Sequence, residues 1–282
     1  MFTSPHLVDF RERIQVQGDM ISKADTMRLG NRLLSMDFGV YPTMFDYCLA
    51  MALLYFKEQK CDVVILETGL GGTYDSTNAC GVPDVTVIAK IGFDHMAILG
   101  DTLAKIAAEK AGIIKHGTAL VLESQEKEAM DVLNKAAERA DIKTTKVVKL
   151  DEIRILPQKD GKQCFSYAGY DAVTMKMLGV HQYENAVAAM LAAELFFEKY
   201  FAGKKNVPER KALQHAIREG IDRTQWMGRM ELVSNDPFFL MDGAHNSNGV
   251  EALKKSLETM YPDEKFHFIM GVMADKDYGE MI

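Results

Sequence analysis

Short apolar runs alternate with stretches of helical periodicity along most of the chain. Between the runs, apolar residues recur every three or four positions, which indicates amphipathic helices. The runs themselves predict buried strands at 63–66, 85–88 and 119–122, with a second set at 239–241 and 266–270. This alternation is typical of an α/β fold, here a mostly parallel sheet flanked by helices.

Three helices stand out from this pattern. One begins after Thr43, where Asp46 completes a capping-box-like start, and carries an apolar stripe to Tyr55. A second starts at Asp101 or Thr102. A third, over 182–200, is apolar on nearly every side, which predicts burial on more than one face.

The rhythm breaks in two places. Residues 156–173 are rich in turn signals, which predicts a β-excursion with a hairpin instead of another strand–helix unit. The strand and helix rhythm then restarts at 230–233, after a polar stretch. We therefore expect two α/β domains, 1–226 and 227–282.

Composition narrows the class of function. Of 282 residues, 48% are hydrophobic and 26% charged, as in a soluble globular protein, and the net charge is −7. That charge disfavours a broad nucleic-acid surface or an anionic-membrane face, so we expect neither as a partner. The four cysteines form no C-x-x-C pair, no signal peptide is recognisable, and no apolar segment is long enough to span a bilayer. These features predict a cytoplasmic protein.

Candidate chemistry lies where polar residues end the apolar runs, because open α/β sheets bind ligands beyond the carboxyl ends of their strands. Glu67 ends the first run and opens a segment with three glycines, which suits metal or phosphate binding; the alternative is a strand-end glutamate beside a tight turn. His95, in the pair Asp94-His95, follows the next strand. If the two strands are neighbours, Glu67 and His95 converge.

Two further places carry reactive side chains. Lys110 falls in the apolar stripe of its helix, where burial would favour the neutral amine; the alternative is that it reaches solvent from the helix end. In 242–246, Asp242 follows a strand, and His245 and Asn246 enter the next helix. This segment could hold a ribose or an anion, or Asn246 or Ser247 could simply cap the helix.

One motif is missing from the sequence. The pattern G-x-x-x-x-G-K-[ST] of a phosphate loop occurs nowhere in the 282 residues. Stabilisation of β- and γ-phosphates by such a loop is therefore not available from these residues.

The ordered blocks of the sequence resemble folylpolyglutamate synthase and dihydrofolate synthase, of the Mur ligase family. The resemblance covers nearly the whole chain. It is carried by Ser4-Pro5-His6-Leu7, Glu67 to Gly72 with Asp75 to Asn78, Asp94-His95, Glu109-Lys110-Ala111-Gly112, His181-Gln182 with Asn185, Trp226 to Met230, Asp242 to Asn246, and Asp275-Lys276-Asp277.

The resemblance implies a Mur-ligase-like central domain, followed by the start of a smaller Rossmann-like α/β domain. It also implies an ATP-dependent amide ligase. ATP would phosphorylate a carboxylate of folate or dihydropteroate, and the amino group of L-glutamate would attack the acyl phosphate. It implies that Glu67 and His95 bind Mg²⁺ and that Lys110 is carbamylated and helps to organise the metal, so that these three are the catalytic residues. It further implies nucleotide contacts for Asn185, Arg229 and Asp242.

The resemblance also implies a substrate site. His245 would lie on the amino-acid side, Phe45 would stack on the pterin, and Asp75 and the segment 4–7, with Ser4 and His6, would lie nearby. An alternative within the family is a ligase that acts on a cell-wall precursor. Another is a non-catalytic remnant that only binds folate or a nucleotide.

Some features depart from the family pattern. The family has its phosphate loop just before the Ser-Pro-His-Leu block, and Thr73, Tyr74 and Gly243 replace its usual residues. We therefore expect a chain truncated at both ends that does not turn over ATP alone. Intact relatives are expected to be monomers, whereas this chain is expected to self-associate through unpaired sheet edges.

Overall fold

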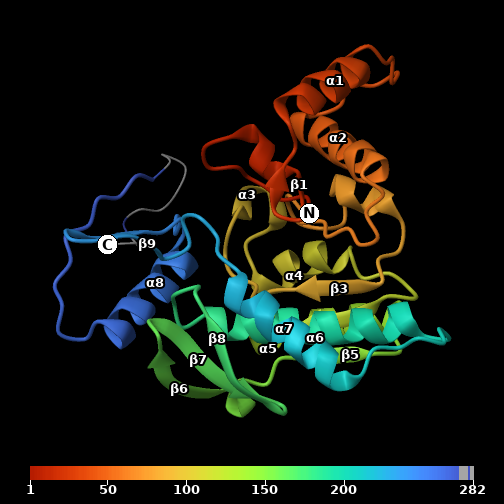
Figure 1. Cartoon of the computed structure of the whole chain (residues 1–282). Coiled ribbons are helices and arrows are strands. Elements are labelled where there is room, and N and C mark those ends of the chain that lie inside the picture. The colour runs from red at the N-terminus through yellow and green to blue at the C-terminus, as the bar shows by residue number, and fades with distance from the viewer. Residues whose placement is uncertain (273–278, 280–282) are drawn as a thin grey trace. The chain divides into compact units, whose positions relative to one another are not determined.

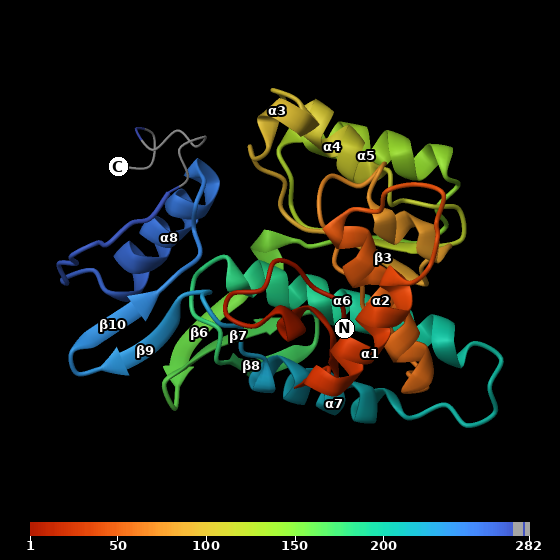
Figure 2. The ribbon, with the colours of Figure 1, turned by 90° about the horizontal axis from the view of Figure 1, so that it is seen from above.

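The computed structural model describes residues 1–272 and 279 (Figures 1 and 2). The chain forms two compact units, and each is described by itself. The first comprises Met1–Gly81 and Glu109–Ile113, and the second comprises Val82–Ala108 and Ile114–Ile282. The predicted block Asp275-Lys276-Asp277 lies outside the described residues.

The first unit is built around two packed helices. Its core is formed mainly by α1 and α2, together with Phe2, Ile14 and Ile21, which are fully buried. Thr43 caps α2 through the predicted capping box with Asp46. The elements are η1 (Phe10–Arg13), β1 (Gln15–Val16), β2 (Asp19–Met20), α1 (Lys23–Leu34), α2 (Met44–Glu58) and η2 (Ser76–Cys80).

The second unit contains the expected parallel sheet. Its strands β3 (Val85–Ile88), β4 (Ala119–Leu122) and β5 (Thr145–Val147) are parallel and lie in that order. The crossovers carry α3 (Met96–Leu99), α4 (Leu103–Ala111), whose last residues belong to the first unit, and α5 (Lys127–Arg139); η3 (Leu150–Glu152) follows β5. The carboxyl ends of β3 and β4 therefore meet at one edge.

The predicted β-excursion is a three-stranded antiparallel sheet of β6 (Arg154–Lys159), β7 (Lys162–Tyr167) and β8 (Tyr170–Met175). Helix α6 (Gln182–Phe201) shares one core with residues of both sheets, among them Val121 of β4 and Phe165 of β7. Burial against two sheets explains why this helix is apolar on nearly every side. Helix α7 (Arg210–Arg223) contacts β8.

A hairpin and a helix end the described chain. Strands β9 (Glu231–Asn235) and β10 (Phe238–Met241) pair antiparallel, and α8 (Ser247–Met260) follows. The fully buried Ser256 of α8 accepts a hydrogen bond from Val180 N (3.0 Å) and donates to Ala252 O (2.7 Å). This bond fixes α8 beside the residues that lead into α6.

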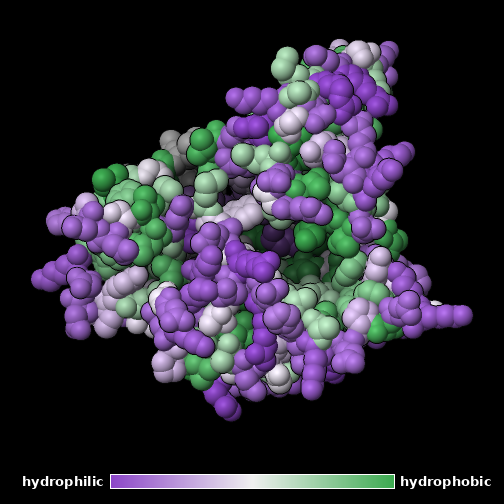
Figure 3. Space-filling model, viewed as in Figure 1, coloured by the Kyte–Doolittle hydropathy of each residue, from purple (hydrophilic) through white to green (hydrophobic). Residues whose placement is uncertain are grey.

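Two strand predictions are wrong. Residues 63–66 form no strand; Leu66 makes one isolated bridge to Phe2, and Val63, Val64 and Ile65 are 40–63% exposed. Residues 266–270 are likewise not a strand, and Ile269 is 98% exposed. An apolar run becomes a strand only where a neighbouring strand satisfies its backbone, and the described residues supply none here. Apolar surface around the C-terminal hairpin is visible in Figure 3.

No helix in the described part of the chain combines the length and apolar character that a bilayer crossing requires. Cys48, Cys61 and Cys164 are free thiols, as the cysteine spacing predicts.

Candidate functional site

In the first unit, the predicted glycine-rich loop packs directly on the end of α4. A Cβ atom added to Gly72 would lie 2.5 Å from Glu109 O and 2.7 Å from Lys110 O. Thr73 N donates to Glu109 O at 2.9 Å, which ties the same turn to the helix. The structure therefore brings the backbone of the predicted catalytic Lys110 against the loop that Glu67 opens.

The side chains of Glu67 and Lys110 reach the surface. Glu67 is exposed, and its Oε2 accepts hydrogen bonds from Ser4 N (2.9 Å) and the Thr3 hydroxyl. Lys110 is only half-buried, so it is less sheltered than its place in the apolar stripe suggests. The reason is its position in the last turn of α4, after Ile106 and Ala107 have taken the fully buried face.

Asp75 holds the glycine-rich loop in shape. Its Oδ2 accepts hydrogen bonds from Gly69 N (2.9 Å) and Leu70 N (3.0 Å), and its Oδ1 accepts from Thr77 N (2.9 Å) and the Thr77 hydroxyl (2.5 Å). The residue is only 8% exposed. These hydrogen bonds show that Asp75 organises the loop. A direct contact between Asp75 and the substrate stays a prediction.

We expect Asp75→Asn to loosen this loop. In the variant, one of the two carboxylate oxygens becomes an NH₂ group, which cannot accept a hydrogen bond from a backbone N–H. Each lost hydrogen bond to a charged acceptor is worth about 1.5–3 kcal/mol. Amide hydrogen exchange at Gly69 and Leu70 or at Thr77 should accelerate by at least about tenfold. Asp62→Asn, on an exposed aspartate of the same unit, is the control. Unchanged exchange in Asp75→Asn would contradict the assignment.

The predicted pterin-side residues lie in the same unit. The Phe45 ring packs on Gly69, where an added Cβ would lie 2.6 Å from it, and makes an edge contact with Phe2 (centroids 5.4 Å apart). His6 Nδ1 accepts a hydrogen bond from Arg13 Nε at 2.9 Å. Phe45 is thus held against the loop that Asp75 shapes, and its stacking role stays a prediction.

In the second unit, Asp94 joins two of the predicted places. Its Oδ2 accepts a hydrogen bond from Asn246 Nδ2 (2.9 Å) and lies 3.6 Å from His245 Nε2 and 3.8 Å from His95 Nε2. Its Oδ1 accepts from His95 N (2.8 Å), where His95 has a left-handed backbone with φ 48°. The loop after β10 therefore meets the segment after β3 at this one carboxylate. His95 and Glu67 belong to different units, and their predicted convergence stays a prediction.

Asp242 and Gly243, at the start of the β10–α8 loop, lie against residues 229–230. The Asp242 carboxylate accepts from Met230 N and Ala244 N, both at 2.8 Å. A Cβ added to Gly243 would lie 2.8 Å from Arg229 Nη1, so the absence of a side chain at 243 gives the guanidinium its place. Asn246 caps α8 by accepting from Gly249 N (2.8 Å), which confirms the simple capping reading for that residue.

The first turn of α6 carries a chain of hydrogen bonds. Asn185 is exposed, and its Nδ2 donates to Gln182 Oε1 at 3.0 Å. Gln182 Nε2 in turn lies 3.2 Å from His181 Nε2. Burial lowers the pKa of His181, Asp242 raises it and Arg229 lowers it, so the ring is neutral near pH 7. His181 therefore feels the charges of Asp242 and Arg229 and also lies beside the Gln182–Asn185 pair.

Glu123 is a buried carboxyl that the sequence reasoning missed. It ends the run 119–122, so the rule applied to Glu67 would have found it. It is 3% exposed, and its Oε2 accepts from Lys90 N at 2.6 Å. Burial raises its pKa to about 7, the nearby Glu184 carboxylate adds to the rise, and the bond from Lys90 N opposes it. Glu184, in the first turn of α6, accepts from Ser124 N at 2.7 Å.

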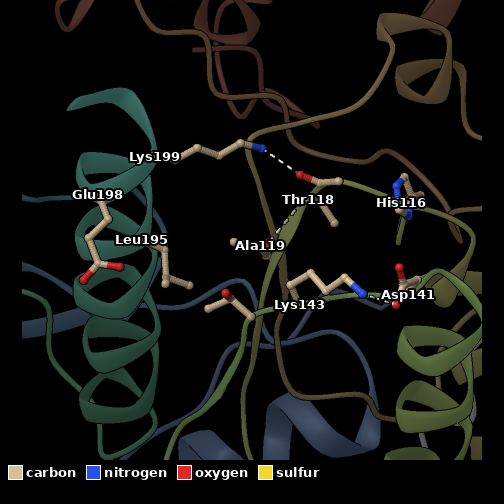
Figure 4. Close-up of a pocket in the computed structure, with 10 residues that line it drawn as sticks. His116, Thr118, Ala119, Asp141, Lys143, Leu195, Glu198 and Lys199 are labelled. Carbon is tan, nitrogen blue, oxygen red and sulfur yellow. Dashed lines mark hydrogen bonds and ion pairs between the residues drawn. The ribbon is translucent and has the colours of Figure 1, made fainter. Parts of the chain in front are cut away.

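A pocket of about 440 Å³ opens at the opposite end of the parallel sheet, beside the starts of β4 and β5 (Figure 4). Lys143 pairs there with Asp141 (2.5 Å), and Lys199 of α6 pairs with Asp84 (3.2 Å) and donates to Gly117 O (2.8 Å). No predicted site residue lines it. Its lysines are already satisfied by protein groups, so we assign it no ligand.

Two protein families match the sequence. The Mur ligase middle domain matches residues 39–193, and the Mur ligase glutamate ligase domain matches residues 228–282. Together they cover most of the chain and include every predicted catalytic and nucleotide-site residue.

Folylpolyglutamate synthases of other organisms match all or most of the chain. The dihydrofolate synthase/folylpolyglutamate synthase of Bacillus subtilis is 38% identical, over 100% of this chain and 66% of its own length. A folylpolyglutamate synthase of Arabidopsis thaliana is 35% identical over 90% of this chain and 45% of its own. The chain therefore spans less than two thirds of the length of these relatives.

Solved structures agree. The Mycobacterium tuberculosis folylpolyglutamate synthase complexed with ADP superposes with a TM-score of 0.81 at 30% identity, covering 99% of this chain and 63% of that one. The E. coli FolC protein in complex with DHPP and ADP superposes with a TM-score of 0.79 at 27% identity, with the same coverage.

Proposed function

This chain belongs to the Mur ligase family, and from that premise we propose that it is the greater part of an ATP-dependent ligase that adds L-glutamate to folate or dihydropteroate. The single observation that carries the proposal is the 38% identity to a dihydrofolate synthase/folylpolyglutamate synthase along the entire chain. The solved relatives crystallised with ADP, with DHPP or with AMPPCP and folate add support for the ligand classes.

The reaction has two chemical steps. A carboxylate oxygen of the acceptor attacks the γ-phosphorus of ATP and releases ADP. The amino nitrogen of glutamate then attacks the acyl phosphate, loses a proton and expels inorganic phosphate, which leaves an amide. Charge develops on phosphoryl oxygens in both steps, so preorganised cationic and N–H groups lower the barrier most.

We assign nucleotide contacts to Asn185, Arg229 and Asp242, and the amino-acid side to His245. The geometry that supports these assignments is the β10–α8 loop, because it carries Asp242 and His245 together and meets Asp94 beside His95. An exposed Arg229, seated over Gly243, is suited to pair with phosphate oxygens.

Magnesium is the metal that we propose. Mg²⁺ is usually held by one or two carboxylates with substrate phosphates and waters, rather than by a protein cage. The exposed Glu67 carboxylate fits that pattern, and the described residues contain no group of three or more His, Cys, Asp or Glu that could hold a metal alone. Glu67, His95 and a carbamylated Lys110 would hold the ion, which neutralises charge on the transferring phosphoryl group.

We further infer a central domain of residues 1–226 and a C-terminal domain from 227. The first matched family segment ends at residue 193 and the second begins at residue 228. The position of the second segment supports this boundary. A cytoplasmic location and self-association of this chain remain part of the proposal; light scattering tests the latter.

Binding and turnover measurements test the function. By titration calorimetry the 282-residue chain should bind ADP and either dihydropteroate or folate, and the acceptor that binds identifies the activity. Asn185→Ala should weaken ADP about threefold to tenfold by losing one hydrogen bond. Asn134→Ala, on the exposed face of α5, is the matched control.

Without a phosphate-loop motif, this chain alone should show no ATP hydrolysis above background. Normal turnover would overturn that expectation while supporting a ligase. Failure to bind any of the ligands would contradict the proposed function.

A further inference from the structure

We infer that Arg13 is a positioning residue, which fixes the ring of His6 so that its Nε2–H donates a hydrogen bond to a carboxylate oxygen of the acceptor. The inference rests on the proposed function, because it requires that a pterin carboxylic acid binds to the first unit. It goes beyond that function by giving Arg13 a role and His6 a defined donor atom.

Residues 4–12 form a loop whose two ends are held together. Thr3 N, just before the loop, donates to Arg13 O, just after it, at 3.0 Å. Inside the loop, the Glu12 carboxylate accepts hydrogen bonds from the backbone N–H groups of residues 7–9, at 2.6–2.9 Å. A compact loop of this kind, organised by its own side chains, has a defined backbone and is frequently functional.

The direction of the hydrogen bond between Arg13 and His6 is settled by the chemistry of the two groups. Arg13 Nε lies 2.9 Å from His6 Nδ1, and a guanidinium nitrogen can only donate. Nδ1 therefore accepts and carries no proton, which leaves the proton of the ring on Nε2. A ring protonated on both nitrogens would set one N–H group against another and one positive charge against another. The contact therefore holds His6 in a single tautomer.

The orientation of the ring is restricted as well. The rings of His6 and Phe10 make an edge contact, with their centroids 6.0 Å apart and their planes at 71°. Arg13 and Phe10 thus both contact the imidazole. His6 is only partly buried, and its Nε2 makes no hydrogen bond with any residue that the structure describes. The Nε2–H group is therefore a fixed donor that a ligand can reach.

The surroundings of this loop favour a carboxylate as the ligand. Ser4, two residues before His6, donates from its backbone N to Glu67 Oε2 at 2.9 Å, and Glu67 is the proposed magnesium ligand. Phe2, at the start of the same segment, makes its edge contact with Phe45, the predicted pterin-stacking ring. An acceptor that stacks on Phe45 has to bring its carboxylate to the metal. The segment from Phe2 to His6 connects these two places, and an N–H donor on it matches a carboxylate oxygen.

Nuclear magnetic resonance of the ring nitrogens tests the role of Arg13 directly. In the isotope-labelled wild-type chain at about pH 8, where an ordinary histidine is neutral, His6 should show the Nε2–H tautomer alone. Arg13→Met keeps a long side chain but removes the donor, so both tautomers should appear. His6→Ala identifies the signals by removing them. Arg32→Met, the same change at an exposed position of α1, should leave them unaltered. A wild-type proton on Nδ1, or an unchanged ring in Arg13→Met, would refute the role.

The affinity for the acceptor tests the ligand. It is measured by calorimetry with whichever of dihydropteroate and folate the wild-type chain binds. His6→Ala should weaken binding about tenfold or more, because a hydrogen bond to a carboxylate is lost, and Arg13→Met about threefold to tenfold. The double variant should lose only what His6→Ala loses, because Arg13 acts through His6. The affinity for ADP should stay at the wild-type value in all three, and circular dichroism verifies folding.

The failure of this inference can be told apart from the failure of the proposed function. If the wild-type chain binds neither acceptor, both fall together. If it binds one and folded His6→Ala keeps the full affinity, the donor role of His6 is refuted and the proposed function stands. If Arg13→Met costs as much in the His6→Ala background as in the wild type, Arg13 makes a contact of its own and its positioning role is refuted. An equal loss of ADP affinity would also refute it.

Discussion

Replacing Gly72 with alanine should lower the free energy of unfolding of the first unit by about 3 kcal/mol, because the added methyl group has no space. The atoms it would meet, Glu109 O at 2.5 Å, Lys110 O at 2.7 Å and Lys110 Cα at 3.0 Å, all belong to the backbone of α4. They cannot rotate away as a side-chain tip could. The loop or the helix end must move, and the bond from Thr73 N to Glu109 O is lost.

Chemical denaturation followed by circular dichroism, with amide exchange at Thr73 as the local probe, measures this effect. Gly220→Ala is the matched control: it lies inside α7 with nothing within 4 Å of an added Cβ. That substitution should stabilise by about 0.5–1 kcal/mol, since alanine loses less backbone freedom in a helix. A Gly72→Ala variant as stable as the wild type would show that the loop does not pack on α4.

Glu123 should make the second unit less stable as the pH rises from about 4.5 to about 7. Burial raises the pKa of Glu123 to about 7 in the folded chain, against about 4.3 in an unfolded one. Over that interval the folded state binds more protons than the unfolded state, so the free energy of unfolding falls with pH, and the loss is complete above the folded pKa. The difference between these two pKa values corresponds to about 4 kcal/mol.

Glu123→Gln removes the titration and keeps a carbonyl oxygen for Lys90 N. Relative to the wild type, the variant should therefore gain about 3 kcal/mol in stability between pH 4.5 and pH 8, whatever constant offset the buried amide adds. Urea unfolding at several pH values measures this difference. Glu138→Gln, on the exposed face of α5, makes the same chemical change at the surface and should leave the wild-type pH profile intact. If the free energy of unfolding changes with pH in the same way in Glu123→Gln and in the wild type, the raised pKa of Glu123 is contradicted.

Glu123 and Gln125 also support the segment that follows β3. Glu123 holds Lys90 N at the point where β3 ends, and Gln125 accepts from Ile91 N at 2.8 Å on the next residue. These bonds position the segment that leads to Asp94 and His95.

The sequence predicts much of the secondary structure. The capping box at Thr43, the apolar surround of α6, the turn-rich excursion and the runs that became β3 and β4 all follow from local preference and periodicity. The glycines around Glu67 were also recognisable as a place of close approach. Each of these signals depends on neighbours in sequence, and neighbours in sequence stay neighbours after folding.

The sequence does not predict which apolar runs find a neighbouring strand. Residues 63–66 and 266–270 have strand composition, yet no strand of the described chain offers them a ladder. The position of Glu123 at the end of an apolar run was visible in the sequence, but its 3% exposure depends on segments that are distant in sequence.

The amino-acid order alone determined the alternation of strands and helices, the capped helix starts and the set of polar residues at the ends of apolar runs. Only the tertiary structure decided that Asp94 would be shared by His245 and Asn246, which are about 150 residues away in sequence. The physical reason is the separation in sequence between the interacting residues. Periodicity and capping act over a few residues, whereas hydrogen bonds across 152 positions of sequence and the burial of a carboxyl exist only once distant segments have packed.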